Sequence, residues 1–333
     1  MRHFLSSDDL SPSEQAVLID RAIEMKHTPR GDGSRVLEGR SVGLIFEKPS
    51  TRTRIAFEAA VFELGGHPIA LRAEELQLDR GETLEDTAKV LSGYLSAIVL
   101  RTFGQERLDA LAETSTIPVV NALSDLEHPC QALADVMTIV ENFPDPSQVT
   151  VAYLGDGNNV CHSLLLAGAK AGLGKIIVAC PQGFEPIEPI VERAAAIGVE
   201  TGCRIKVTND PARAAAGAQV LYTDVWISMG QEEEQQTRRR VFRDYRLSSQ
   251  MLAEASPEAV VMHCLPAHRD EEIATEVMDG PRSVIWEQAA NRLPAQKALL
   301  EWLMTLDAAK EGPAAGLDGM GAGAMDEDGR RVR

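Results

Sequence analysis

The chain has 333 residues, of which 44% are hydrophobic, and its formal net charge at pH 7 is −17. This length predicts about two domains, and the hydrophobic fraction suffices for two ordinary cores. The strong negative charge argues against a nucleic acid or an anionic membrane as a partner, because such polyanions would be repelled over the whole surface. Any anionic ligand therefore needs a locally basic pocket.

The cysteines and the first residues favour a cytoplasmic protein. The five cysteines are widely scattered and form no CxxC pair, which indicates reduced thiols rather than a disulfide framework or a zinc ribbon. The opening residues, MRHFLSSDDL, contain no apolar signal segment. No stretch reaches the roughly 18 apolar residues that a membrane span requires.

Strand-like and helix-like segments alternate in the first half of the chain. Ser11, Pro12 and Glu14 predict the capping box of a first helix. Strands are then predicted over residues 42–46, 68–71, 97–100 and 118–121, and helices near residues 52–64, 84–95 and 105–114. Such alternation is typical of a mostly parallel sheet. An amphipathic helix, HPCQALADVMTIVENF, follows, and PDPSQ after it predicts a domain boundary.

A second series of strand-like runs begins after that boundary. The runs are VTVAYLGDG, KIIVAC, RIKVT, AQVLYTDVW, AVVMHCL and SVIWEQ. The simplest interpretation is α/β architecture with two doubly wound parallel-sheet domains, over residues 1–143 and 149–292, and an active site in the interdomain cleft. A last helix is predicted over about 293–308. Residues 311–333 are rich in Gly, Ala and charge, so we expect a disordered tail.

The stretch FEKPSTRTRIAFE (46–58) joins a predicted strand to a predicted helix. A helix start has unpaired backbone N–H groups and a positive dipole end, so it is a natural anion site. Arg101, His128 and Gln131 also fall at strand ends or helix starts that would face the same crevice. Donors from several segments at one crevice predict a site for a phosphate-sized dianion, for which planar arginine forks are suited.

The stretch VAYLGDGNNVCHSLLLAGAKAG invites a different interpretation, a dehydrogenase that binds a nicotinamide dinucleotide. The third glycine of GxGxxG would fall at Val160, and the next strand ends in VACPQG without an acid for a ribose hydroxyl. The alternative is a tight turn in which Asn158 and Asn159 are turn or cap residues, either of which could project toward the crevice.

The stretch MHCLPAHR places His263 and Cys264 at the carboxyl end of a predicted strand, where ligands bind in open α/β sheets. Successive strand side chains point to opposite faces, so these two residues are not expected to pair as nucleophile and base. A zinc site from His263, Cys264 and His268 lacks a fourth ligand in register, and a buried thiol that ends a core strand is the alternative. We predict neither a metal nor a cofactor.

The stretch TDVWISMGQEEE leaves a predicted strand at Asp224. A carboxylate at a strand end could bind an ammonium group, and it could equally be an N-cap. The run EEEQQTRRR after it is expected to be a solvated surface helix rather than a binding patch.

Five motifs in this order, FEKPSTRTR, EHPCQALAD, GDGNNV, DVWISMG and MHCLPAHR, closely resemble the ornithine carbamoyltransferase family. The resemblance covers about residues 3–308, and the DxxxSMG pattern distinguishes the ornithine branch from the aspartate branch. It implies transfer of the carbamoyl group of carbamoyl phosphate to the δ-amine of L-ornithine, which gives L-citrulline and phosphate in arginine biosynthesis. It also implies at least a homotrimer and a C-terminal helix that packs back on the first domain.

The resemblance carries site residues over one by one. Carbamoyl phosphate contacts are expected from Ser50, Thr51, Arg52, Thr53, Arg101, His128 and Gln131. Gln77 matches a further contact, in a loop that family members lend to a neighbouring subunit. Ornithine contacts are expected from Asn159, Asp224, Ser228 and Met229. Cys264, Leu265 and Arg292 match the strip along the reacting carbonyl and the amine, and catalytic roles are expected for Arg52, Arg101, His128, Cys264 and Arg292.

The chain also departs from the family pattern. Ala290 and Pro294 replace a more usual acid and His, LSGYLS lacks the usual Arg and Asp, and Cys161 stands where a smaller residue is more frequent. These positions lie outside the substrate contacts, so they put local packing or subunit contacts in doubt. The remaining alternatives are another amine acceptor (acetylornithine, putrescine or aspartate) and a non-catalytic regulatory or assembly protein on the same fold.

Overall fold

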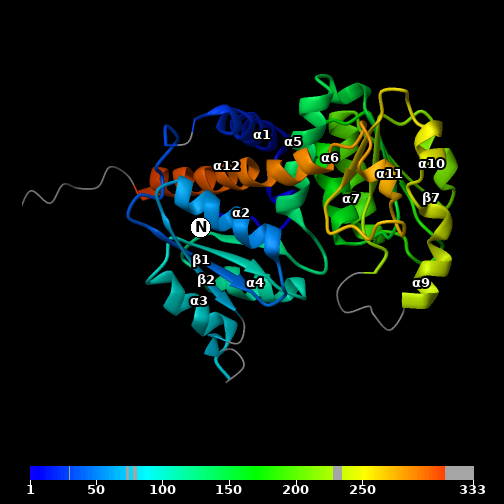
Figure 1. The fold of residues 1–333 in the computed structure, drawn as a ribbon. Coiled ribbons are helices and arrows are strands. Elements are labelled where there is room, and N and C mark those ends of the chain that lie inside the picture. Colours follow the sequence, from blue (N-terminus) through cyan, green and yellow to red (C-terminus); the bar gives the residue numbers. More distant parts are fainter. Residues whose placement is uncertain (30, 73–74, 78–80, 228–234, 312–333) are drawn as a thin grey trace, which may run out of the picture.

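The computed structural model describes residues 1–29, 31–72, 75–77, 81–227 and 235–311. They form two α/β domains, each built on its own parallel sheet (Figure 1). The predicted disordered tail lies outside the described residues from position 312 onward. None of the described helices is long and apolar enough to cross a membrane.

The first domain has a four-stranded sheet in the order β2-β1-β3-β4, with every pair parallel. Its strands are β1 (Ser41–Phe46), β2 (His67–Arg72), β3 (Ala97–Arg101) and β4 (Val119–Leu123). Its helices are α1 (Pro12–His27), α2 (Thr51–Glu63), α3 (Leu84–Ser92), α4 (Gln105–Thr114) and α5 (Pro129–Asn142), after a short 3-10 helix, η1 (Ser7–Asp9). Ser11 caps α1 through the predicted capping box.

The second domain has a five-stranded parallel sheet in the order β7-β6-β5-β8-β9. Its strands are β5 (Thr150–Leu154), β6 (Lys175–Ala179), β7 (Arg204–Thr208), β8 (Val220–Thr223) and β9 (Val260–His263). Its helical elements are η4 (Pro146–Gln148), α6 (Asn159–Lys170), α7 (Glu188–Thr201), α8 (Pro211–Ala215), α9 (Gln235–Val241), η6 (Arg243–Tyr245), α10 (Ser249–Glu254) and α11 (Thr275–Met278). The two doubly wound sheets confirm the predicted fold class.

The final helix, α12 (Ile285–Glu311), corrects one prediction. The run SVIWEQ was expected to be a strand, but only Ser283 forms a β-bridge, with Val261, and the helix begins two residues later. A short apolar run does not distinguish a strand from a buried helix start. The helix continues through Pro294.

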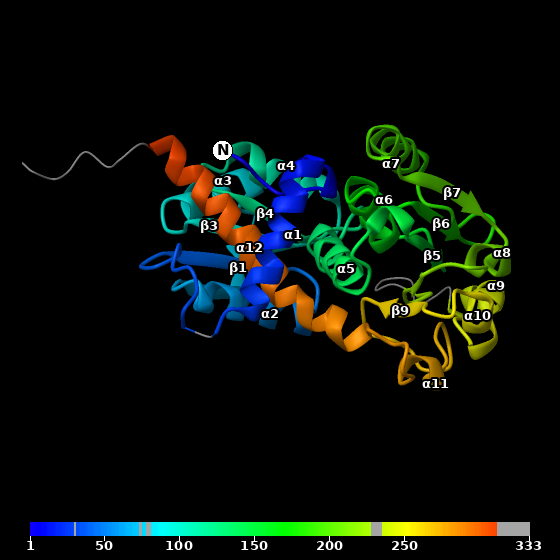
Figure 2. The ribbon, with the colours of Figure 1, turned by 90° about the horizontal axis from the view of Figure 1, so that it is seen from above.

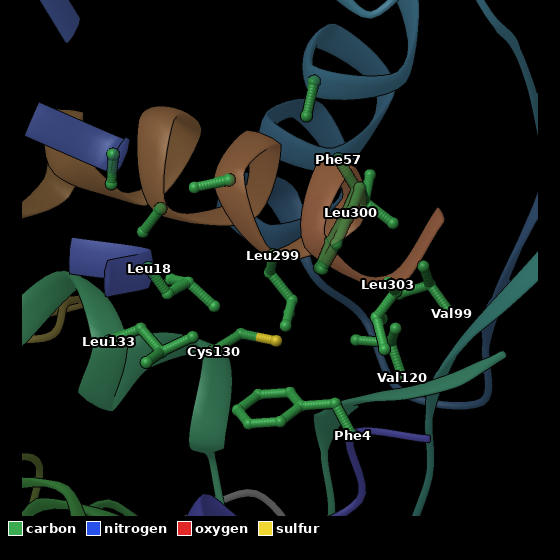
Figure 3. Close-up of a cluster of buried hydrophobic side chains, with 14 of the residues drawn as sticks. Phe4, Leu18, Phe57, Val99, Val120, Cys130, Leu133, Leu299, Leu300 and Leu303 are labelled. Carbon is green, nitrogen blue, oxygen red and sulfur yellow. The ribbon is translucent and has the colours of Figure 1, made fainter. Parts of the chain in front are cut away.

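Helix α12 connects the two domains. It begins near β9 and then runs back along α1, α2 and α5 (Figures 1 and 2). Leu299, Leu300 and Leu303 of α12 pack in one core with Phe4, Phe57 and residues of β3, β4 and α5 (Figure 3). Replacing one of these fully buried leucines by alanine would cost about 2–5 kcal/mol. The C-terminal helix is therefore part of the core of the first domain.

Each sheet has one switch point, where the strand order reverses. In the first sheet it lies between β1 and β3, and in the second it lies between β5 and β8. Ligands of open α/β sheets bind outside the carboxyl ends of the strands at such points. The loops after these four strands are therefore the first place to look for a site.

Candidate active site

The segment after β1 forms the N-terminus of α2. Ser50 is the N-cap residue, but its side chain makes no capping hydrogen bond, so it does not satisfy the N–H groups of its own helix. Thr53 is buried, and its Oγ1 accepts a hydrogen bond from Nη2 of Arg292 on α12. Thr51 is exposed and Arg52 is half-buried. The start of α2 thus presents backbone donors and a cation in one place.

Arg101 ends β3, at the other side of the same switch point. The register between β3 and β4 shifts between Leu100 and Arg101, so that Arg101 pairs with Leu123. A bulge of this kind redirects a side chain at a strand end. Arg101 is 8% exposed, although it carries a charge.

Four cationic or ionisable side chains gather at this point. Burial, followed by the charges of Arg292 and Arg52, lowers the pKa of Arg101 to about 10. Burial and the charge of Arg52 lower the pKa of Arg292 to about 10. Burial and all three arginines lower the pKa of His128 well below its ordinary value, so that its ring is neutral at pH 7. The predicted cluster of Arg52, Arg101, His128 and Arg292 is therefore brought together, and its members repel one another.

These same side chains keep buried polar atoms without a partner among the described residues. The atoms are Nε of Arg52, Arg101 and Arg292, Nδ1 of His128 and Oε1 of Gln131. Buried polar groups are almost always hydrogen-bonded, and an unpaired one costs about 1–3 kcal/mol. Repelling cations with unused donors fit a small dianion.

The second domain contributes a different arrangement at its own switch point. Asp224 follows β8, and its Oδ2 accepts a hydrogen bond of 2.8 Å from Nδ2 of Asn158, which follows β5. Its Oδ1 accepts a hydrogen bond of 2.9 Å from Sγ of Cys264. Burial and the nearby Asp224 carboxylate raise the pKa of Cys264 well above its ordinary value, so the sulfur is a thiol. A thiol that donates to a carboxylate is not a nucleophile.

Asn158 is a functional residue that the sequence analysis did not place in the site. Its Oδ1 caps α6 by accepting from the N–H groups of Val160 and Cys161, and its Nδ2 reaches Asp224. The predicted ligand Asn159 instead donates to the backbone oxygen of Ser124, at a distance of 2.6 Å, across to the first domain. The paired Asn residues left both roles open in the sequence.

The backbone after β9 departs from the expected strand alternation. Strand β9 ends at His263, and one ligating atom each of Asp224, His263 and Cys264 lies within 4.8 Å of the others. The argument that His263 and Cys264 must point to opposite faces is therefore wrong, because regular pleating stops between them. The two still do not pair, since Cys264 donates to Asp224 and His263 Nδ1 accepts from the backbone N–H of Leu265 at 2.9 Å.

Leu265 adopts a left-handed conformation, with φ of 60°. Such a backbone costs on the order of 1–2 kcal/mol for a residue with a Cβ. His263 holds it through its Nδ1, while His263 Nε2 lies 3.2 Å from Oε1 of the buried Glu272. The predicted strip of Cys264 and Leu265 thus has a buried support that no sequence motif indicated.

Three predicted site residues lie apart from this geometry. Ser228 and Met229 lie outside the described residues. Gln77 is exposed, in a short described stretch between residues 73–74 and 78–80, which are outside the description.

The dinucleotide and zinc interpretations find a structural replacement. A Cβ on Gly157 would lie 2.1 Å from the backbone nitrogen of Pro186, so this glycine permits a close approach of two loops. Within the described residues, potential metal ligands group as Asp224, His263 and Cys264, and as His268, Glu271 and Glu272. The predicted trio of His263, Cys264 and His268 is not among these groups.

The expected surface helix is only partly solvated. Arg239 of α9 is exposed and pairs with Glu271. Arg238 is buried, and its guanidinium donates to Asp156 at 2.7 Å and to the backbone oxygen of Trp226 at 2.9 Å. The prediction was wrong for Arg238, since a charge run in sequence does not show which arginine turns inward.

Comparison with known families identifies the class of protein. A family model for the carbamoyl-P binding domain of aspartate/ornithine carbamoyltransferase matches residues 2–141. A second model, for the Asp/Orn binding domain, matches residues 147–303. The chain belongs to the aspartate/ornithine carbamoyltransferase family, which confirms the resemblance seen in the five motifs.

Individual relatives fall in the ornithine branch. An ornithine carbamoyltransferase from Parafrankia sp. is 60% identical over 305 residues, covering 91% of this chain and 96% of that protein. One from Acidothermus cellulolyticus is 56% identical over 310 residues, covering 93% and 98%. The solved structure of ornithine carbamoyltransferase from Pyrococcus furiosus superposes with a TM-score of 0.88 at 46% identity, covering 91% of this chain and 97% of that one.

Proposed function

We propose that this chain transfers the carbamoyl group of carbamoyl phosphate to the δ-amine of L-ornithine, giving L-citrulline and phosphate. One observation carries the proposal: repelling cations with unused buried donors face a site that an asparagine, a carboxylate and a thiol line from the second domain. A dianionic donor would neutralise the first group. An amino acid with two ammonium groups would meet the second.

The first domain supplies the donor site. Backbone N–H groups at the start of α2, with Ser50, Thr51, Arg52 and Thr53, bind the phosphate, which the helix dipole favours. Arg101 and the neutral ring of His128 donate to the carbonyl oxygen as it becomes an oxyanion. Gln131, Arg292 and the backbone at Cys264 and Leu265 surround the rest of the carbamoyl group.

The second domain orients the acceptor. Asp224 binds the α-ammonium group of ornithine, because a carboxylate at a strand end fixes orientation. Asn159, Ser228 and Met229 complete this site by family resemblance. Asn158 holds Asp224 in place. The polarizable sulfur of Cys264 lies beside Asp224, where it favours the neutral δ-amine.

The reaction needs no covalent enzyme intermediate. The δ-amine attacks the carbonyl carbon, a tetrahedral intermediate forms, and the C–O bond to phosphate breaks. Forming the neutral amine near pH 7.4 from an ammonium with a pKa of about 10.4 costs on the order of 4 kcal/mol. Holding both reactants in place supplies roughly 7–11 kcal/mol, which offsets that cost. The departing phosphate accepts the final proton.

Domain roles, assembly and pathway follow as parts of the same proposal. Residues 1–143 form the carbamoyl phosphate-binding domain and residues 149–292 the ornithine-binding domain, which the matched ranges of the two family models support. Gln77 contacts carbamoyl phosphate of a neighbouring subunit, so the active form is a homotrimer or a multiple of it. The enzyme works in arginine metabolism in the cytoplasm.

The deciding experiment is a product assay on the purified chain with carbamoyl phosphate and four amines: ornithine, acetylornithine, putrescine and aspartate. We expect citrulline from ornithine and at least a hundredfold lower turnover of the other three, because only ornithine offers both a free α-amino acid and a terminal amine. Preferred turnover of any other amine would overturn the ornithine assignment. Absence of all turnover would favour a non-catalytic protein.

A further inference from the structure

A buried carboxylate lies behind the proposed carbamoyl site. Asp135 of α5 is 0% exposed and accepts three hydrogen bonds. Its Oδ1 accepts from Nε2 of Gln131 at 2.8 Å and from Nε2 of Gln288 at 2.7 Å, and its Oδ2 accepts from the hydroxyl of Tyr222 at 3.0 Å. An ionised carboxylate can only accept hydrogen bonds, so all three partners must present donors to it.

The orientation of the Gln288 amide is fixed independently. Its Oε1 accepts from the backbone N–H of His263 at 2.8 Å, and a backbone N–H can only donate. Its Nε2 therefore faces the other way, toward Asp135 and Tyr222. Because Gln288 cannot turn without losing both interactions, it holds Asp135 in the acceptor role.

The consequence falls on Gln131. This side chain is 1% exposed, and its Nε2 is used by Asp135. Its Oε1 must then point away from Asp135, and that oxygen is buried without a partner in the described part of the chain. A buried amide oxygen without a donor is costly, so the site requires an N–H from a ligand at this position.

We propose that Asp135 is a positioning residue: it holds the Gln131 carbonyl toward the reacting group and so selects an acyl phosphate that carries an NH2, carbamoyl phosphate, over one that carries a methyl group, acetyl phosphate. The inference rests on the proposed function, since it concerns the same donor site. The two molecules are close in size, so the hydrogen bond rather than the shape of the pocket distinguishes them.

The charge state of Asp135 supports this role. Burial raises the pKa of Asp135 to about 6, while its three donors and Arg292 act against that shift. At pH 8 the group is therefore ionised and accepts from all three partners. Arg292 belongs to the proposed donor site, so Asp135 also faces that site electrostatically.

The test compares binding of carbamoyl phosphate and acetyl phosphate by calorimetry at pH 8. Asp135→Leu removes the acceptor and leaves Gln131 free to turn its NH2 inward. We expect the ratio of the two dissociation constants, acetyl over carbamoyl, to fall by about tenfold or more, through weaker carbamoyl phosphate binding. Equal weakening of both ligands, or an unchanged ratio, would overturn the proposal and leave Asp135 a purely structural role.

Two control variants separate orientation from packing. Asp135→Asn keeps an oxygen for both glutamines and can turn its NH2 to the Tyr222 oxygen, so we expect the ratio to stay within about threefold of wild type. Tyr222→Phe removes the third donor but leaves both amides in place, and we expect the ratio to be unchanged. Loss of selectivity in either variant would contradict the assigned hydrogen-bond polarity.

A double-mutant cycle tests whether Asp135 acts through Gln131. Gln131→Leu should lower the ratio by itself, and adding Asp135→Leu should then change it by less than about twofold. If Asp135→Leu does not fold, Asp135→Ser serves instead, because its hydroxyl is too short to replace the carboxylate. Failure of both variants to fold would assign Asp135 to the fold and overturn the proposal. If wild type forms citrulline while the ratio fails to move, only this inference falls.

Discussion

The two switch points of the molecule differ in how far they satisfy themselves. At the first, Arg52, Arg101 and Arg292 repel one another and keep unused buried donors among the described residues. At the second, Asp224 already accepts hydrogen bonds from Asn158 and Cys264. One side is arranged for a ligand that it does not replace with protein atoms, and the other is closed upon itself.

This difference separates two ways of binding. A dianion at the first switch point removes repulsion and fills unused donors, so it binds without breaking protein hydrogen bonds. An ammonium group at the second must compete with the existing donors of Asp224. We therefore expect the first site to be preformed for carbamoyl phosphate and the second to adjust when ornithine arrives.

The largest effect is expected from removing one of the repelling cations. Arg52→Ala should lower kcat/KM by about a thousandfold and abolish measurable carbamoyl phosphate binding, because a preorganised charge aimed at the leaving phosphate is lost. Calorimetry with carbamoyl phosphate and thermal unfolding check this. The unfolding temperature should not fall, since the variant relieves repulsion.

Arg54 provides the matched control on the same helix. Its Nε pairs with Oε1 of Glu58 at 2.8 Å, one helical turn away. Arg54→Ala should cost less than about tenfold in kcat/KM. Unchanged carbamoyl phosphate affinity in Arg52→Ala, or an equal loss in both variants, would remove the contrast between the two switch points.

The next effect is the pH dependence of turnover, which neither switch point should itself produce. His128 has a lowered pKa and is neutral from pH 6.5 to 8.5, whereas the raised pKa of Cys264 keeps its thiol protonated over the same range. Arg101, with a pKa of about 10, stays charged. The rise therefore belongs to the δ-amine of ornithine, whose neutral fraction increases about tenfold per pH unit below about 10.4.

We thus expect kcat/KM for ornithine to increase by about a hundredfold between pH 6.5 and 8.5. The slope should be the same in His128→Gln, although the rate is lower, because the imidazole does not titrate in this range. A flat profile would show that neutral ornithine does not react. A slope that disappears only in His128→Gln would assign the titration to the enzyme.

A smaller effect should follow from a change at the second switch point. Asp224→Asn replaces the proposed partner of the α-ammonium group, and a hydrogen bond to a charged group is worth about 1.5–3 kcal/mol. The KM for ornithine should rise roughly tenfold or more, while carbamoyl phosphate affinity in calorimetry stays within about twofold. Parallel losses for both substrates would mean that the two regions are not independent.

Much of this architecture was predictable from the sequence because its signals are local. The two sheets follow from the alternation of hydrophobic runs and helices, and Arg101 and Asp224 were placed at strand ends for that reason. The cluster of Arg52, Arg101 and His128 followed because carboxyl ends of parallel strands meet at one edge.

What the sequence did not predict depends on contacts between distant segments. Gln288 lies 153 positions from Asp135 and was expected in a strand, yet it fixes the polarity of a buried network. Asn158 and Asn159 are neighbours of the same type, and only the capping geometry of α6 separates their roles. Arg238 turns inward because Asp156 and the Trp226 carbonyl lie there, which no charge pattern reveals.

The smallest expected effect measures the difference between the two regions directly, through stability. Inorganic phosphate at a hundred times its dissociation constant should raise the free energy of unfolding by about 2.7 kcal/mol, because it binds the folded cation cluster and not the unfolded chain. Ornithine alone at the same concentration should give less, since Asp224 is already hydrogen-bonded. Chemical unfolding at constant ionic strength, with chloride as the reference, measures both. Arg52→Ala should remove the phosphate effect and leave the small ornithine effect unchanged. Equal stabilisation by the two ligands would mean that the second switch point is as unsatisfied as the first, which the hydrogen bonds to Asp224 argue against.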